Sequence, residues 1–233
     1  MRVAVFSDVH GNVRALEAVL AEIKARGPFD AVVNGGDLAY GGPRPREALD
    51  LLMQGGYPTV LGNTDVWIAG MEPGGGDTVA WARRQLEPRH EAFIRRLPRE
   101  HRIEPPGSPP LVVVHATPSS LSDMLIPDAP EEIVEEVFDQ ARTRALVYGH
   151  IHKAYVREVA GGVVVNAGAV GFPFDGIPKA SFAILRLEGG RWRAENVRVA
   201  YDHEAVAKEL MASTHPDGRA FARRLLNASI HTG

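Results

Sequence analysis

Short apolar runs alternate with amphipathic segments in the first third of the chain. The runs at Val3–Phe6, 30–34 and 58–61 have the length and continuity of buried strands. Between the first two runs, apolar residues recur at the spacing of one helix face, at Leu16, Val19, Leu20 and Ile23. This helix is predicted to end at Gly27-Pro28, and a second to begin near Pro43 or Pro45. Strands that alternate with helices indicate βαβ units and a largely parallel sheet.

The last third of the chain has the pattern of antiparallel strands followed by helices. Four apolar or alternating runs are predicted to be strands, at Tyr155–Val159, Val163–Asn166, Ser181–Leu187 and Trp192–Val199. The glycine pairs Gly161-Gly162 and Gly189-Gly190 separate these runs and are typical of hairpin turns. Two helices are predicted to follow, over about 202–212 and 217–228.

The region between these two parts has a different composition. Residues 66–100 contain Trp67, Trp81 and many arginines among glycines. The arginines fit a solvated helix face or, alternatively, a phosphate-binding patch. The length of 233 residues fits a single domain, 1–233, in which about 66–100 form a helical insertion or lid and about 202–228 a C-terminal helical extension.

Composition excludes several classes of protein. Hydrophobic residues make up 45% and charged residues 24%, which is typical of a globular chain with a sizeable core. The net charge of −3 gives no basis for non-specific nucleic-acid binding, and the absence of Cys excludes disulfides, a thiolate nucleophile and a Cys-type zinc site. No apolar stretch approaches the roughly 18 residues that span a bilayer. We therefore expect a soluble, cytoplasmic protein without a membrane partner; the pattern does not predict an oligomeric state.

Five of the apolar runs stop at side chains that bind metal ions. The residues that follow them are, in chain order, Asp8 and His10, Asp37, Asn63, His115, and His150 and His152. Residues two apart at a strand end can point to the same side, so Asp8 and His10 could chelate one ion. Carboxylate, amide and imidazole ligands together suit divalent metals that activate water for hydrolysis.

Most of these motifs have an ordinary structural explanation when taken alone. The Asp-x-His motif could be a turn aspartate and a surface histidine, Asp37 could cap the next helix, and Asn63 could occupy a turn. Likewise, His115 could be a core histidine bonded to the backbone. The pair His150 and His152 favours a metal even by itself, because two imidazoles after a buried strand rarely serve packing.

Together the motifs favour a metal cluster. Ligands of open α/β sheets bind beyond the carboxyl ends of the strands, where all five motifs fall. Two metal ions about 3.5–4 Å apart need seven such side chains if one carboxylate binds both ions. Mn, Fe, Ni and Zn all accept these ligands, so the sequence predicts two divalent ions without choosing the element.

The order of these motifs resembles that of the calcineurin-like metallophosphoesterase superfamily, most of all its compact bacterial and archaeal phosphodiesterase-type branch. The likeness extends from residue 1 to about 187 and includes the run Asn166–Gly171, which is similar to the Asn-Pro-Gly-Ser-Val-Gly run of that branch. The resemblance implies an α/β fold, a four-layer α/β/β/α sandwich with two mixed sheets.

The resemblance also implies how the ligands divide between two ions. One ion is expected at Asp8, His10, Asp37 and His152. The second is expected at Asp37, Asn63, His115 and His150, so that Asp37 bridges. Asn63 and His150 are also expected to bind phosphate, and Asp65 is a further candidate for a catalytic role. A bridging anionic oxygen balances two cations, and a water between them would supply hydroxide near neutral pH.

The chain departs from the family pattern at Thr64. The family often has Gly-Asn-His-Asp/Glu, where the histidine is thought to protonate the leaving group, but here the sequence is Gly62-Asn63-Thr64-Asp65. A hydroxyl holds its proton too tightly to act as that acid at neutral pH. Leaving groups of low pKa are therefore favoured, although His10 or a lid residue could substitute for the missing acid.

The sequence thus predicts a metal-dependent phosphoric ester hydrolase. We expect a dinuclear phosphoesterase that hydrolyses small-molecule phosphodiesters or nucleotides by attack of metal-activated hydroxide. The enzymatic alternatives are a serine/threonine phosphoprotein phosphatase and a dinucleoside-polyphosphate hydrolase. The alternative of a different class is a non-catalytic scaffold with the same fold.

Overall fold

The computed structural model describes residues 1–159 and 161–231. The strands are β1 (Arg2–Phe6), β2 (Ala31–Asn34), β3 (Glu100–Ile103), β4 (Leu111–Val114), β5 (Ala145–Tyr148), β6 (Tyr155–Val159), β7 (Gly162–Asn166), β8 (Ala180–Glu188) and β9 (Arg191–Val199). The helices are α1 (Val13–Arg26), α2 (Pro45–Gly55), α3 (Asn63–Ile68), α4 (Gly76–Arg83), α5 (Pro88–Ile94), α6 (Glu131–Ala141), α7 (His203–Ala212) and α8 (Gly218–Asn227).

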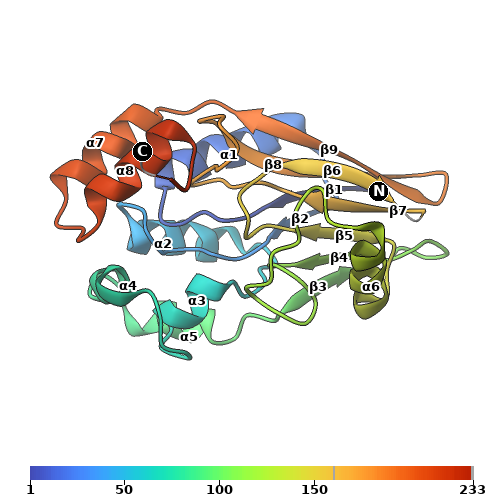
Figure 1. The fold of residues 1–233 in the computed structure, drawn as a ribbon, viewed down its shortest axis with the longest axis horizontal. Coiled ribbons are helices and arrows are strands. Elements are labelled where there is room, and N and C mark those ends of the chain that lie inside the picture. Colours follow the sequence, from blue (N-terminus) through green and yellow to red (C-terminus); the bar gives the residue numbers. More distant parts are fainter. Residues whose placement is uncertain (160, 232–233) are drawn as a thin grey trace.

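The strands form two mixed sheets. One has the order β2-β1-β8-β9 and the other β3-β4-β5-β7-β6 (Figure 1). The pairs β1–β2, β4–β5 and β5–β7 are parallel, and the other strand pairs of the two sheets are antiparallel. The largely parallel sheet suggested by the strand–helix alternation is therefore wrong, because β8 returns from the C-terminal part of the chain to pair antiparallel with β1.

Side-chain alternation in the strands builds the four layers. In β1, Val3 and Val5 are buried in the core between the two sheets, whereas Ala4 and Phe6 are buried against helices on the outer face. In β4, Leu111 and Val113 face the same inter-sheet core, and its two other valines pack with α6 on the opposite outer face. Successive strand residues point to opposite faces, so strands buried on both sides must be continuously apolar. The predicted α/β/β/α sandwich with two mixed sheets is confirmed.

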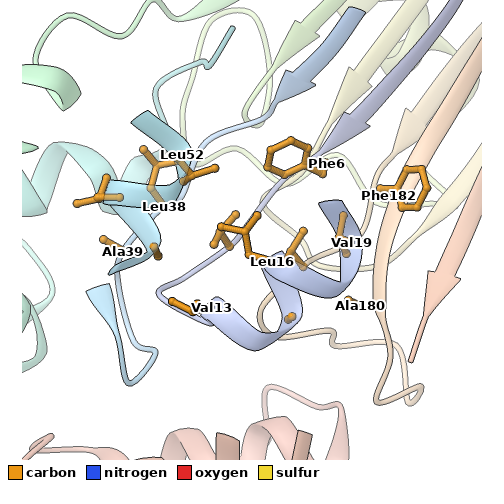
Figure 2. Packing of buried hydrophobic residues seen from close by; sticks show 14 of the residues in the cluster. Phe6, Val13, Leu16, Val19, Leu38, Ala39, Leu52, Ala180 and Phe182 are labelled. Atoms are coloured by element: carbon orange, nitrogen blue, oxygen red, sulfur yellow. The ribbon is translucent and has the colours of Figure 1, made fainter. Parts of the chain in front are cut away.

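Helix α1 covers the outer face of the first sheet as its periodicity predicts. The Asn12 side chain accepts a hydrogen bond from the Ala15 amide (3.2 Å) and so caps the first turn. Leu16 and Val19 of the buried face belong to the same apolar cluster as Phe6 and Phe182 of the sheet (Figure 2).

The predicted strand at 58–61 is wrong. This segment lies beside β2 but forms only an isolated parallel bridge, between Asn34 and Thr59. Pro58 has no amide hydrogen to donate, and the chain turns into α3 at Asn63, so no ladder develops. Sequence reasoning did not identify the antiparallel strand β3 or the helix α6.

Both predicted hairpins are present. Strands β8 and β9 are joined at Gly189-Gly190, where both φ angles are positive (57° and 75°), as a tight hairpin turn requires. In the other hairpin, β6 and β7 are antiparallel, and Val159 is the partner of Gly162. Gly162 therefore belongs to β7, one residue earlier than the predicted start of this strand. Residue 160 lies outside the described residues.

The predicted C-terminal helices are α7 and α8, and they lie together at one end of the strands, near α2 (Figure 1). They share a small apolar core with Phe172, which follows β7. Helices α4 and α5 occupy the predicted helical region, where Arg83 and Arg89 pair with Glu91 and Asp50 respectively, as a solvated face would. Within 1–159 and 161–231, the structure has no helix that is long and apolar enough to cross a membrane.

The inter-sheet core predicts a large stability effect for Leu185 of β8. This side chain is fully buried between the sheets (0% exposed), so Leu185→Ala leaves a cavity and should lower the free energy of unfolding by about 3–5 kcal/mol. Leu226→Ala on α8, where the leucine is 41% exposed, should cost about 1 kcal/mol or less. Urea unfolding followed by circular dichroism measures both, and equal losses would contradict this assignment of the core.

Candidate metal centre

The candidate ligands lie in loops that are held together by backbone hydrogen bonds. The amide of Asp8, after β1, donates to the carbonyl of Gly36, after β2 (2.9 Å). The amide of Gly149, after β5, donates in the same way to the carbonyl of His115, after β4 (2.9 Å). The two sheets meet where the His150 amide donates to the Asp8 carboxylate (3.1 Å to Oδ2). Four strand ends therefore converge on one place.

Most of the candidate ligands have a left-handed backbone conformation. Among the described residues, seven non-glycine residues have positive φ, and five of these are candidate ligands: Asp8 (58°), His10 (51°), Asp37 (58°), His150 (62°) and His152 (57°). The other two, Arg142 and Ala228, cap helices. Such conformations cost on the order of 1 kcal/mol each or more and concentrate at functional sites. The loops thus turn the side chains inward at an energetic cost.

Two glycines make room for the carboxylates. A Cβ on Gly149 would lie 2.1 Å from Asp8 Oδ2, and a Cβ on Gly62 would lie 2.2 Å from Asp37 Oδ1. Both distances are far below van der Waals contact. Glycine at these two positions is therefore what allows Asp8 to pack against the end of β5 and Asp37 to pack against the start of α3.

The first group of ligand atoms comprises Asp8, His10 and His152. Their nearest oxygen and nitrogen atoms lie within 4.8 Å of one another. His152 Nε2 is 3.2 Å from Asp8 Oδ1, and His10 Nε2 is 3.1 Å from His152 Nε2. The side chains are almost completely buried, so this is an enclosed set of one carboxylate and two imidazoles.

The second group is arranged around Asn63. Its Oδ1 lies 2.9 Å from His115 Nε2 and 3.0 Å from His150 Nδ1. Asp37 lies between the two groups, since its Oδ2 is 3.5 Å from His10 Nε2 and its Oδ1 is 3.5 Å from His115 Nε2. Asp8, Asp37 and His115 also form a compact set, so Asp8 is close to both groups. All seven sequence-predicted ligands are thus brought together.

Backbone carbonyls orient the four imidazoles. The Nδ1 atoms of His10 and His115 lie 2.8 Å from the carbonyls of Tyr40 and Gly35, and Nδ1 of His152 faces the carbonyl of Phe172. His150 is reversed, with Nε2 3.1 Å from the carbonyl of Ser122. Each carbonyl accepts an N–H, so in the neutral ring the other nitrogen presents a lone pair to the centre.

This donor set fits divalent cations. The short contact between His10 and His152 joins two lone-pair nitrogens, and the contacts of Asn63 Oδ1 with His115 and His150 join lone pairs in the same way. Converging lone pairs repel one another unless a cation or a proton lies between them. Carboxylate, amide oxygen and imidazole are the ligands that first-row divalent metals accept.

The electrostatics of the centre favour deprotonated ligands at several positions. Burial lowers the pKa of His10 to about 4, although the Asp37 charge opposes this, and burial likewise lowers the pKa of His150. Burial alone would raise the pKa of Asp8, but the neighbouring histidines, His152 foremost, outweigh burial and lower it. Burial would also lower the pKa of His115 and His152, but the Asp37 charge at His115 and the Asp8 charge at His152 outweigh burial and raise it. A metal requires neutral imidazoles, so it would compete with protons at these two histidines.

Asp65, the further candidate for a catalytic role, is fully buried and bonded to backbone amides of the neighbouring loops. Its carboxylate accepts hydrogen bonds from the amides of Asp37, Leu38 and Gly62, each at 2.9 Å. Burial and the Asp37 charge raise the pKa of Asp65, while the amide donors oppose that rise. Because its oxygens are occupied by the loop backbone, Asp65 is placed to position Asp37 and Asn63.

Sequence reasoning missed the residues that form the cavity beside the ligands. This cavity of about 270 Å³ is lined on one side by ligand residues and Thr64 and on the other by Tyr40, Phe172, Phe221 and Arg224. Trp67 also lines it, whereas Trp81 is buried in the core and donates to Thr214 Oγ1 (3.1 Å). Phe221 had the sequence signal of an apolar helix face only, which does not distinguish a core residue from a cavity wall.

The chain is similar to known proteins along most of its length. The model of the calcineurin-like phosphoesterase superfamily domain matches residues 1–190. An uncharacterized protein from Methanocaldococcus jannaschii is 28% identical over 240 residues, which cover 92% of this chain and 94% of that protein.

Two solved structures extend this similarity. A metallophosphoesterase from Sphaerobacter thermophilus has a TM-score of 0.76 and 27% identity, with 98% of this chain and 99% of that chain covered. A hypothetical protein from Pyrococcus horikoshii OT3 has a TM-score of 0.83 at 22% identity, with 100% and 98% covered, and shows the same fold. The family match and the fold agree with the expectation from the strand-end motifs, and the chain belongs to the calcineurin-like phosphoesterase superfamily.

Proposed function

We propose that this protein is a dinuclear-metal-dependent phosphoesterase that hydrolyses phosphodiester or nucleotide-type substrates. The observation that supports it best is the convergence of seven ligand side chains whose imidazoles are oriented by backbone carbonyls. Membership of the calcineurin-like phosphoesterase superfamily supports phosphoester hydrolysis as the reaction class. We further propose a single domain, 1–233, with a helical insertion or lid at about 66–100 and an extension at about 202–228.

The proposed ligand sets follow the two groups of side chains. One ion would be held by Asp8, His10, Asp37 and His152, and the other by Asp37, Asn63, His115 and His150; Mn, Fe, Ni and Zn all suit these ligands. When bound, such ions lower the pKa of water and balance charge on phosphoryl oxygens. The near-equal distances from Asp37 to His10 and His115 support its place as the shared ligand.

The other residues of the site would orient the ligands and the phosphate. Asp65 positions the loop that carries Asp37, and the Thr64 amide donates to Asp37 Oδ1 (2.9 Å), which fixes this carboxylate from a second side. Asn63 and His150 line the cavity and would also contact the phosphate. In hydrolysis, a water oxygen bonds to phosphorus as the bond to the leaving oxygen breaks, and the leaving group keeps that electron pair.

Thr64 limits the leaving group in this proposal. It is buried, lines the cavity and has an Oγ1 without a hydrogen-bond partner in the described part of the chain. Its hydroxyl cannot protonate a leaving oxygen near neutral pH. His10 is a poor substitute, because its lowered pKa leaves it unprotonated and its Nε2 faces the ligand cluster. Esters whose leaving group is stable as an anion are therefore the favoured substrates.

Replacing the shared carboxylate tests the dinuclear proposal. Asp37→Asn removes one negative charge but keeps the shape, and should lower metal content and reduce kcat/KM for bis(p-nitrophenyl) phosphate with Mn²⁺ by at least about 100-fold. Asp139→Asn on α6, whose side chain is 75% exposed, is the matched control and should have no effect. Metal analysis and absorbance assays measure both.

Removal of metal by a chelator and a panel of phosphoester substrates distinguish the proposed function from the alternative functions. Metal-independent turnover, or full activity of Asp37→Asn, would contradict the proposal. Less than one equivalent of metal after loading would instead favour a scaffold. Comparison of diesters with phosphopeptides and dinucleoside polyphosphates distinguishes the enzymatic alternatives.

Introducing an imidazole at position 64 tests the leaving-group argument. Thr64→His places a group with an ordinary pKa of about 6.5 where the family often has its acid. We expect turnover of esters with alkyl leaving groups to rise about tenfold or more, while p-nitrophenyl esters change little. Thr64→Val is the control, because it removes the hydroxyl without adding an acid.

The measurement is the slope of log kcat against leaving-group pKa, which should be steep for the natural protein and for Thr64→Val and shallower for Thr64→His. A shallow slope in the natural protein would show that another residue already supplies the proton.

A further inference from the structure

The cavity beside the ligands has two chemically different sides. Ligand residues and Thr64 form one part of its lining, and aromatic rings form most of the rest, which we call the aromatic side. The ligand residues suit the phosphoryl group alone. The aromatic side has no role in the proposed hydrolysis. A volume of about 270 Å³ leaves room for a substituent of the ester as well.

The aromatic side is a preformed wall. The ring of Tyr40 meets those of Trp67 and Phe221 at 5.8 Å each, edge to face, and Phe172 meets Phe221 at 5.5 Å. Rings that pack against one another in this way hold fixed orientations. A fixed apolar wall of this kind favours a flat aromatic group over a flexible or strongly hydrated one.

Arg224 adds a cation to this wall. Its guanidinium carbon lies 5.0 Å from the centroid of the Phe221 ring. Within 1–159 and 161–231, the side chain of Arg224 forms no ion pair or hydrogen bond, and its Nε is buried without a partner. The nearby carboxylate of Asp217 accepts instead from Thr78 Oγ1 (2.6 Å). A buried guanidinium donor without a partner favours a ligand that brings acceptor atoms.

A second cavity adjoins the first. It has a volume of about 230 Å³, shares Asn63 and Trp67 with the aromatic cavity, and is lined by Arg99 and the hydroxyl residues Ser119 and Ser120. Asn63 therefore borders two cavities, one with a largely aromatic lining and one lined by an arginine and hydroxyl groups. A diester with two unlike substituents matches this arrangement better than a monoester does.

We propose that helix α8 completes a specificity subsite for a heteroaromatic, nucleoside-like substituent of a phosphodiester. The ring lies against Phe221 and Tyr40, and Arg224 donates to acceptor atoms of that substituent. Phe221 and Arg224 lie outside the residues matched by the family model, 1–190, so this subsite is separate from the family's metal ligands. The inference rests on the proposed function for the position of the phosphate.

Binding of product-like probes tests the subsite directly. The Mn²⁺-loaded protein is titrated calorimetrically with adenosine 5′-monophosphate and with ribose 5-phosphate, which lacks the ring. We expect the first to bind about tenfold tighter or more, from stacking and donation by Arg224. Arg224→Met should lower the affinity for adenosine 5′-monophosphate about tenfold and leave that for ribose 5-phosphate unchanged. Phe221→Leu should reduce the preference between the two probes.

The control is Arg223→Met, because this neighbouring arginine is exposed on the same helix and does not line the cavity. Equal affinities for the two probes, or an Arg224→Met protein that behaves like Arg223→Met, would overturn the subsite. Metal content is measured for every variant, and if Phe221→Leu does not fold, Arg224→Met decides. Discrimination between the probes without hydrolysis of any diester would contradict the proposed function and leave the subsite standing.

Discussion

The site depends on the left-handed turns that follow β1, β2 and β5. These turns direct five of the candidate ligands inward. Each of the five residues has a positive φ, which non-glycine residues rarely adopt. Neighbouring strand ends hold them in place, through amide–carbonyl bonds between loops and through Asp65, which accepts three loop amides. These bonds each hold the loops of one sheet, and the amide of His150, which donates to the Asp8 carboxylate, joins the two sheets. The complete set of candidate ligands therefore comes together only when both sheets are packed.

Burial makes the charges of this site interdependent. Asp8 and Asp37 are almost fully buried, and a buried carboxylate requires a partner of opposite charge or several donors. The surrounding imidazoles could provide that charge only by protonation, which burial opposes at His10 and His150 and which the two carboxylates favour at His115 and His152. Divalent cations would satisfy carboxylates and imidazole lone pairs together. Metal binding and folding stability should consequently be coupled, since a ligand that binds only the folded state stabilises it.

The sequence identified the seven side chains that converge because their signal is local: an apolar run, then a candidate ligand residue, often beside a glycine. It predicted the helices α1, α7 and α8 for the same reason, from periodicity within one segment. The error at 58–61 came from tertiary structure. An apolar run beside β2 becomes a strand only if several of its amides donate to β2. Pro58 has no amide hydrogen and the chain turns into α3 at Asn63, so only an isolated bridge forms. Arg224 could not be identified from the sequence, because nothing local distinguishes it from the exposed Arg223.

The proposed metal ligands and the proposed selectivity residues come from different parts of the fold. The ligands follow strands in residues 1–190, where the family model matches and where pairing across two sheets leaves little freedom. Phe221 and Arg224 instead come from α8, which packs on α7 and on Phe172 at the open end of the strands. A helix attached at the edge can change its cavity-facing residues without disturbing the loop bonds that hold the ligands. In the proposed enzyme, selectivity could therefore vary while the metal ligands stay the same, because the strand ends would carry the ligands and α8 would carry the residues that contact the substituent.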